Sequence, residues 1–266
     1  MESGNTYWRD RALLEWQVEL GATEAIGDAP VDRYALAPVK PSPAPAAVPQ
    51  TPQPPQPQVR EAVNAVLVAQ EAAEMVQDLG ALATAMEAFD HCEMKRGARS
   101  FVFCDGDPAA RVMIVGEAPG REEDRAGKPF VGRAGQLLDK MFAAIGLARA
   151  ETDPQSALYI TNVLPWRPPS NRTPETEEIA MMLPFLQRHI ALAAPDILVV
   201  MGNTPLQALL GKTGITRLRG QWAEVMGRPC LPMVHPAYLL RNPIAKREAW
   251  ADLLALQARL HELKDK

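Results

Sequence analysis

Four short segments of the sequence combine small residues with side chains that can bind or activate a polar ligand. The first begins at Gly116-Glu-Ala-Pro-Gly120, and the others contain Asn162, Gly202-Asn-Thr204 and His235. Small residues let the backbone approach a ligand closely, while carboxylate, amide and imidazole groups serve hydrogen bonding and acid–base chemistry. These residues predict one ligand site, provided that the fold brings the four segments together.

Each segment follows or ends a short apolar run that is typical of a buried strand. The runs cover 110–115, 157–162, 196–201 and 230–234. Helical patterns cover 134–145, 174–192, 204–210 and about 244–264. Strands that alternate with helices indicate an α/β fold, and we expect three α/β/α layers around a central, mainly parallel sheet of four strands. In such sheets the ligand lies beyond the carboxyl ends of the strands.

The first 59 residues differ in composition from the rest. Apolar residues on one helical face between Trp8 and Ile26 predict a short amphipathic helical segment within 1–35. Residues 36–59 are rich in Pro, Ala and Gln, which predicts an extended linker. We interpret the linker as a spacer rather than a docking site for a proline-recognising protein, and leave open a protein partner of the extension. The remaining domain, 60–266, begins with a helix at about 60–90, interrupted at Gly80.

Composition narrows the class of protein. No apolar run approaches the roughly 20 residues that a membrane helix needs, and the first residues lack the features of a secretory signal. Three widely spaced cysteines do not predict a disulfide framework. We therefore expect a cytoplasmic protein that does not bind membranes.

Charge is divided unevenly along the chain. Residues 1–90 carry 5 Lys and Arg against 13 Asp and Glu, a net charge of −8, whereas residues 91–266 carry 23 against 19, a net charge of +4. The second part is therefore better suited than the first to an anionic polymer.

The longest motif, Gly116 to Leu138, reads GEAPGREEDRAGKPFVGRAGQLL and resembles the first motif of the family 4 uracil-DNA glycosylases. Three further segments are similar to motifs of that family, in its order and spacing. They begin at Tyr159 (YITNVLPWRPPSNRTP), Pro195 (PDILVVMG) and His235 (HPAYLLR). The resemblance covers about 88–260 and leaves residues 1–59 outside.

This resemblance implies an activity. The protein would flip uracil out of DNA, hydrolyse the N-glycosidic bond, and release free uracil from an abasic site, as the first step of base excision repair. We expect it to act as a monomer on uracil-containing DNA at the nucleoid. Its transition state would carry positive charge on the sugar and negative charge on the departing uracil.

The resemblance also implies roles around the base. His235 would donate a hydrogen bond to uracil O2 as negative charge develops there, and Asn162 would recognise the O4 and N3–H edge. Phe130 would stack on the base, and Glu123 would stand near C5, where thymine carries a methyl group. Glu117 is the candidate for holding or polarising the attacking water.

Two further positions flank this set. Gly116 and Ala118 would line the base pocket beside Glu117. Family 1 enzymes carry an Asp at the position of Ala118, so the resemblance leaves the identity of the water-activating group open.

The same comparison implies a set of DNA contacts. Basic loops and a helix start would hold phosphates, and two leucines would form an apolar wedge in the base stack. The expected residues are Arg167, Asn171, Arg172, Gly202, Asn203, Thr204, Arg217, Arg219, Tyr238, Leu239, Leu240 and Arg241.

The chain departs from the family at the metal ligands. Family 4 enzymes typically hold a [4Fe–4S] cluster on four cysteines. The positions matched to them here are Cys92, Lys95, Trp166 and Met182, so a single thiol remains. We therefore predict an enzyme without an iron–sulfur cluster or any other metal, in which these side chains form an apolar patch.

Two alternatives remain at this point. The protein could be a non-catalytic or slow-turnover binder of uracil or abasic-site DNA. It could also belong to another branch of the superfamily, including one that binds uracil covalently through an inserted basic loop ending in His. Residues 167–173 contain no His. Multiple-turnover release of free uracil separates both alternatives from the main interpretation.

Overall fold

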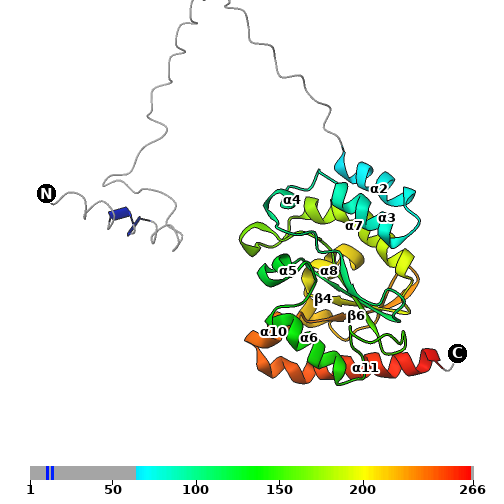
Figure 1. Cartoon of the computed structure of the whole chain (residues 1–266). Helices are drawn as coiled ribbons and strands as arrows, with labels where there is room; N and C mark the ends of the chain where they lie inside the picture. Colours follow the sequence, from blue (N-terminus) through cyan, green and yellow to red (C-terminus); the bar gives the residue numbers. More distant parts are fainter. Residues whose placement is uncertain (1–9, 12, 15–63, 265–266) are drawn as a thin grey trace, which may run out of the picture. The chain divides into compact units, whose positions relative to one another are not determined.

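The computed structural model describes residues 10–11, 13–14 and 64–264 (Figure 1). The chain divides into two units, Met1–Gln58 and Val59–Lys266. Residues 10–11 and 13–14 are helical, and the rest of the amphipathic segment and the linker predicted at 36–59 lie outside the described residues. No helix within the described ranges is both long and apolar enough to cross a bilayer.

A six-stranded sheet in the order β1-β3-β2-β4-β6-β5 forms the centre of the second unit. Its four inner strands are parallel and correspond to the four predicted runs. These are β2 (Val112–Gly116), β3 (Leu158–Asn162), β4 (Ile197–Met201) and β6 (Arg228–Met233). The predicted α/β class is confirmed.

The predicted number of four strands is wrong because an antiparallel strand extends each edge of the sheet. These strands are β1 (Cys104–Gly106) and β5 (Ala223–Val225), which pair with β3 and β6. Each has three residues and no apolar run, so pairing with a neighbouring strand, not local sequence pattern, creates them.

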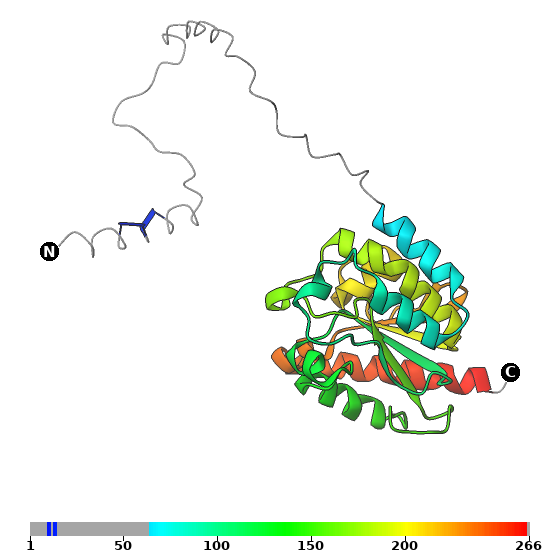
Figure 2. The ribbon, with the colours of Figure 1, turned by 45° about the horizontal axis from the view of Figure 1, so that its top comes forward.

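Helices cover both faces of the sheet (Figures 1 and 2). Alternate residues of each strand point to opposite faces. Met113 and Val115 of β2 therefore join the core beneath α2 (Ala65–Met75), α3 (Leu79–Ala88) and α7 (Thr176–Ala193). Val112 and Ile114 join the core beneath α6 (Arg133–Ala143) and α11 (Lys246–Lys264). The two cores explain why the inner strands are apolar throughout.

The helices follow the predicted pattern closely. The longer ones are α2 (Ala65–Met75), α3 (Leu79–Ala88), α6 (Arg133–Ala143), α7 (Thr176–Ala193), α8 (Asn203–Leu210) and α11 (Lys246–Lys264). Short helices are α4 (Met94–Gly97), α5 (Arg121–Ala126), α9 (Ile215–Leu218) and α10 (Pro236–Arg241), with 3-10 turns η1 (Pro169–Asn171) and η2 (Pro243–Ala245).

The interruption predicted at Gly80 lies a few residues earlier. Asp78 accepts a hydrogen bond from the Ala81 amide at 2.8 Å and so caps a new helix that begins at Leu79. Gly80 is inside α3, where it forms part of the first turn.

Candidate active site

The carboxyl ends of β2 and β3 bring three predicted residues into contact. Gly116 and Asn162 are paired at the ends of these strands. A Cβ atom on Gly116 would lie 2.5 Å from ring atoms of Phe130 and would overlap the Asn162 side-chain oxygen. Glycine is therefore required at 116, because its missing side chain makes room for both neighbours. The convergence predicted for this edge of the sheet is present.

Phe130 also connects this group to the end of β6. Its ring stacks on the His235 imidazole, with centroids 5.3 Å apart and an interplanar angle of 27°. Gly202, which follows β4, lies beside the same imidazole, where a Cβ would be 3.6 Å from that of His235. All four strand-end segments therefore meet at one place.

His235 is held as a neutral hydrogen-bond donor. Its Nδ1 atom accepts a hydrogen bond from the Ala237 amide at 3.1 Å and so caps α10. Burial lowers the pKa of His235 to about 4, with a contribution from the positive charge of Arg241 that outweighs the opposing effect of Glu123. At neutral pH the proton therefore lies on Nε2, which donates to no other described residue and so can donate to a ligand.

Asn162 presents an uncommitted amide. The residue is 6% exposed, yet its side chain makes no hydrogen bond to any other described residue. Its amide atoms keep contact with solvent, because Arg259 Nε is the one fully buried side-chain N or O atom without a partner among the described residues. Asn162 is therefore suited to the hydrogen-bonding edge of a bound ligand.

Glu117 comes directly after Gly116, and its carboxylate is oriented by the first turn of α8. Its Oε2 atom accepts a hydrogen bond from the buried Thr204 hydroxyl at 2.5 Å. Within the described part of the chain, no other group hydrogen-bonds this carboxylate. The second oxygen can therefore accept from a water molecule. The adjacent Ala118 is partly buried and packs against the core.

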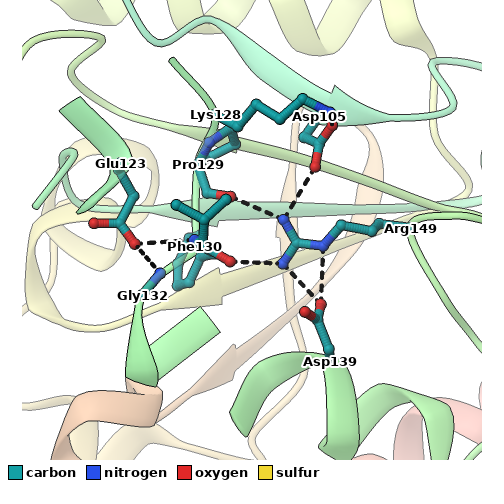
Figure 3. Close-up of polar contacts among 9 residues, drawn as sticks. Asp105, Glu123, Lys128, Pro129, Phe130, Gly132, Asp139 and Arg149 are labelled. Carbon is teal, nitrogen blue, oxygen red and sulfur yellow. Dashed lines mark hydrogen bonds and ion pairs between the residues drawn. The ribbon is translucent and has the colours of Figure 1, made fainter. Parts of the chain in front are cut away.

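Glu123 braces the loop that carries Phe130 (Figure 3). One carboxylate oxygen accepts from the amides of Val131 and Gly132 at 3.0 and 2.8 Å, and the other accepts from Gly120 at 3.1 Å. The sequence did not indicate this arrangement. Its carboxylate points at the backbone of its own loop, so any effect of Glu123 on a ligand passes through that loop.

Two arginines expected to touch DNA have partners inside the protein. Arg172 donates to both carboxylate oxygens of Glu178, at 2.8 and 2.5 Å. Arg219 pairs with the buried Asp252 of α11, with its Nε atom 2.8 Å from Oδ2. These bonds fix a loop and a helix, and each guanidinium is committed to a carboxylate within the protein.

The start of α8 is also tied to the protein. The Asn203 side-chain oxygen accepts from the backbone amides of Gly214 and Ile215 at 3.1 and 2.9 Å. Thr204 is bound to Glu117. Thr204 therefore orients a residue of the site, and Asn203 stabilises the loop at the start of α9.

The two leucines of α10 have different surroundings. Leu239 is fully buried in the core, whereas Leu240 is 38% exposed. Leu239 is therefore excluded from the expected wedge because it has no surface to offer. Of the remaining expected contacts, Arg217 and Arg241 are exposed, Tyr238 is partly buried, and Arg167 donates to Asn171 at 2.8 Å.

Three of the four positions matched to cluster ligands lie in the apolar core. Cys92, Trp166 and Met182 belong to the same buried core, and burial raises the pKa of the Cys92 thiol. Lys95 places its Nζ atom 5.9 Å from the centroid of the Trp166 ring and donates to the Glu87 carbonyl. Across 10–11, 13–14 and 64–264, no group of three or more His, Cys, Asp or Glu residues is placed to hold a metal ion.

Sequence reasoning missed Arg149 and its partners Asp105 and Asp139, which surround the Phe130 loop in Figure 3. These three residues come from different elements and carry no local motif. Burial acts to raise the pKa of Asp105, but hydrogen bonds from Lys128 and Arg149 outweigh it and lower the pKa.

Comparison with known proteins agrees with the motifs. Residues 103–254 match the uracil DNA glycosylase superfamily. A type-4 uracil-DNA glycosylase from Thermotoga maritima is 40% identical over 154 residues, which is 57% of this chain and 77% of that protein. A type-4 enzyme from Pyrobaculum aerophilum is 36% identical over 186 residues, 66% of this chain and 91% of that protein. A type-5 uracil-DNA glycosylase of the same organism is 30% identical over 132 residues, 46% of this chain and 57% of that protein.

Proposed function

Because this chain belongs to the uracil DNA glycosylase superfamily, we propose that it flips uracil out of DNA and hydrolyses the N-glycosidic bond at the edge formed by β2, β3, β4 and β6. It is a uracil-DNA glycosylase of DNA repair. The observation that carries the proposal is the contact of Gly116 with Phe130 and Asn162, and of Phe130 with His235. One chain supplies this whole group, which supports a monomeric enzyme.

His235 stabilises the departing uracil in this proposal. Bond cleavage leaves negative charge on the base. A neutral imidazole with its proton on Nε2 can donate a hydrogen bond to uracil O2. A donor of this kind stabilises the transition state by about 3 kcal/mol. The lowered pKa of His235 and the bond from Ala237 to Nδ1 support this protonation state.

Asn162 and Phe130 select and hold the base. The uncommitted Asn162 amide pairs with the O4 and N3–H edge of uracil, whereas cytosine presents the opposite pattern there and leaves polar groups unpaired. Phe130 stacks on the ring of the base. The Phe130 ring lies beside Gly116 and His235, so its aromatic surface is next to the Asn162 amide and the His235 imidazole.

Glu117 holds the attacking water. The bond from Thr204 fixes one carboxylate oxygen and leaves the other for the water molecule. A positioned carboxylate also supports the positive charge that develops on the sugar. Glu123 excludes thymine indirectly, because its three backbone hydrogen bonds set the wall of the pocket that faces C5.

DNA contacts are assigned to the exposed residues of the expected set. Leu240 is the wedge, and Arg217 and Arg241 approach phosphates. The loop of Arg167 and Asn171 contributes a further basic contact. Arg172, Arg219 and Asn203 stabilise the loops that present these groups.

We also propose that the enzyme works without an iron–sulfur cluster. Such a cluster requires thiolate ligands that converge on a small volume. Lys95 carries an ammonium that repels iron, and Trp166 and Met182 are packed in an apolar core. The donor set therefore does not fit the cluster, and no step of the reaction passes through it. Protein purified without oxygen is expected to be colourless, to lack stoichiometric iron and to excise uracil. Brown, iron-loaded protein would contradict this part.

The experiment that tests the function is multiple-turnover release of free uracil. Oligonucleotides with U·G, U·A, single-stranded U, hypoxanthine and T·G are incubated with catalytic amounts of the full chain. We expect many uracils released per enzyme and no thymine. Release that stops at or below one uracil per enzyme would favour the slow-turnover binder instead.

A further inference from the structure

Phe130 has a backbone conformation that bulky residues rarely adopt. Its φ angle is 53°, in the left-handed region. The ring is nevertheless buried and lies between Gly116 and His235. The direction of the ring depends on this peptide, so the surrounding structure has to hold an unfavourable conformation in place.

Two elements hold the peptide from one side. Glu123 binds the amides of Val131 and Gly132, which follow Phe130. Gly135 of α6 lies so close that a Cβ there would overlap the Phe130 carbonyl. Both contacts belong to the motif that begins at Gly116. Neither binds the carbonyl oxygens of the strained loop.

Arg149 binds those carbonyls from the other side (Figure 3). Its Nη1 atom donates to the Pro129 carbonyl and its Nη2 atom to the Phe130 carbonyl, each at 2.9 Å. Two adjacent carbonyls thus share one planar guanidinium. This geometry fixes the orientation of the peptide that precedes and the peptide that follows the Phe130 Cα atom.

The guanidinium is itself fixed by two carboxylates. Asp139 of α6 accepts from Nε at 2.9 Å and lies 2.8 Å from Nη2, while Asp105 of β1 accepts from Nη1 at 3.2 Å. Lys128 donates to the other Asp105 oxygen at 2.9 Å. The Arg149 guanidinium thus makes four hydrogen bonds and a further ion contact from Nη2, and a lysine ammonium could not reproduce this planar set.

We propose that Arg149 is a positioning residue for uracil excision, which holds the Pro129 and Phe130 carbonyls so that the Phe130 ring stands where the flipped base stacks. This inference rests on the proposed function, in which Phe130 contacts uracil. Arg149 touches neither the base nor the DNA backbone in this role. Its effect is therefore expected on base capture and chemistry, not on general affinity for DNA.

The first test compares Arg149→Lys with Arg111→Lys. Arg111 is a matched control because it is similarly buried and pairs with Asp196 at 2.5 Å, but it precedes β2 at the amino end of the sheet. We expect Arg149→Lys to lower single-turnover uracil release by roughly ten- to a hundredfold and to weaken inhibition by free uracil. Affinity for DNA without uracil should stay unchanged, and Arg111→Lys should excise at the parental rate.

A double-mutant cycle with Phe130→Ala separates positioning from general destabilisation. If Arg149 acts through the ring, Arg149→Lys should cost less than about twofold when the ring is already absent. Asp139→Asn, which leaves Arg149 in place, gives a milder loss in the same direction and serves if Arg149→Lys does not fold.

Three results would overturn the proposal. One is parental excision and parental uracil inhibition in folded Arg149→Lys. Another is an equal fold-loss from Arg149→Lys, or from Asp139→Asn, with and without the Phe130 ring. The third is a parental rate for Asp139→Asn where Arg149→Lys does not fold. A parent enzyme that releases no uracil would instead defeat the proposed function, and the two failures are therefore distinguishable.

Discussion

Replacing Gly116 with alanine tests the contact on which the proposed pocket depends. A Cβ atom at this position would lie 2.5 Å from Phe130 ring atoms, whereas ordinary Cβ contacts begin at 3.4 Å, so the ring must retreat by about 0.9 Å. The Asn162 side chain is displaced as well. A misplacement of about 1 Å in an active site lowers the rate by roughly a hundredfold, and overpacking lowers the free energy of unfolding by about 1–3 kcal/mol.

The assay is single-turnover release of uracil from a U·G duplex, with thermal unfolding measured on the same preparation. Gly97→Ala is the matched control, because a Cβ there meets Pro169 Cγ at 4.0 Å, an ordinary contact. Gly97→Ala should excise at the parental rate. A folded Gly116→Ala enzyme that excises within about twofold of the parent would refute the reasoning, because so small a loss is incompatible with a ring displaced by about 1 Å.

Three further predictions concern pH, the water site and the wedge. The excision rate should stay flat as pH falls from 8 and should drop as pH approaches 4, which is the pKa of His235. Because this pKa lies below the unfolded value of 6.5, the contribution of His235 to the free energy of unfolding is also lost as pH falls from about 6.5 to 4. A pH-rate profile in which the rate already halves near pH 6.5 would contradict a neutral imidazole. Thr204→Val removes the hydrogen bond to Glu117 and should lower the single-turnover rate by roughly ten- to a hundredfold with little change in DNA affinity. An unchanged rate would contradict the role of Glu117 in holding the attacking water. Leu240→Ala should reduce excision from duplex DNA more than from single strands without lowering the melting temperature. Leu239→Ala should lower the free energy of unfolding by about 2–5 kcal/mol, because Leu239 is fully buried. A loss of stability in Leu240→Ala and a duplex-specific loss of excision in Leu239→Ala would exchange the roles of the two leucines.

The sequence predicted the meeting of the strand ends at one edge of the sheet, because that signal is local. Asn162 and His235 each follow or end an apolar run, and parallel strands place such ends at one edge regardless of what lies between them. The edge strands β1 and β5 escaped prediction because they form only by pairing with β3 and β6. Local pattern contains no information about such pairing.

Side-chain partners were the least predictable feature. Arg172 and Arg219 have the charge and the hydrogen-bond donors of phosphate ligands. Each nevertheless pairs with an acidic residue that only the fold brings near. Leu239 and Leu240 are adjacent and chemically equal, and only their positions on α10 decide which one is buried. Arg149 carries no motif, because its role depends on four hydrogen bonds to other parts of the chain.

We propose that the group of residues at the carboxyl edge of the sheet excises uracil. The most direct measurement is the amount of free uracil released per enzyme from a uracil-containing duplex, by the parent and by folded Asn162→Ala and His235→Ala variants. We predict many turnovers for the parent and a rate lower by about a hundredfold or more for each variant, since each loses a contact made to the base as the bond breaks. Near-parental release by either variant, or no turnover by the parent, would contradict the account.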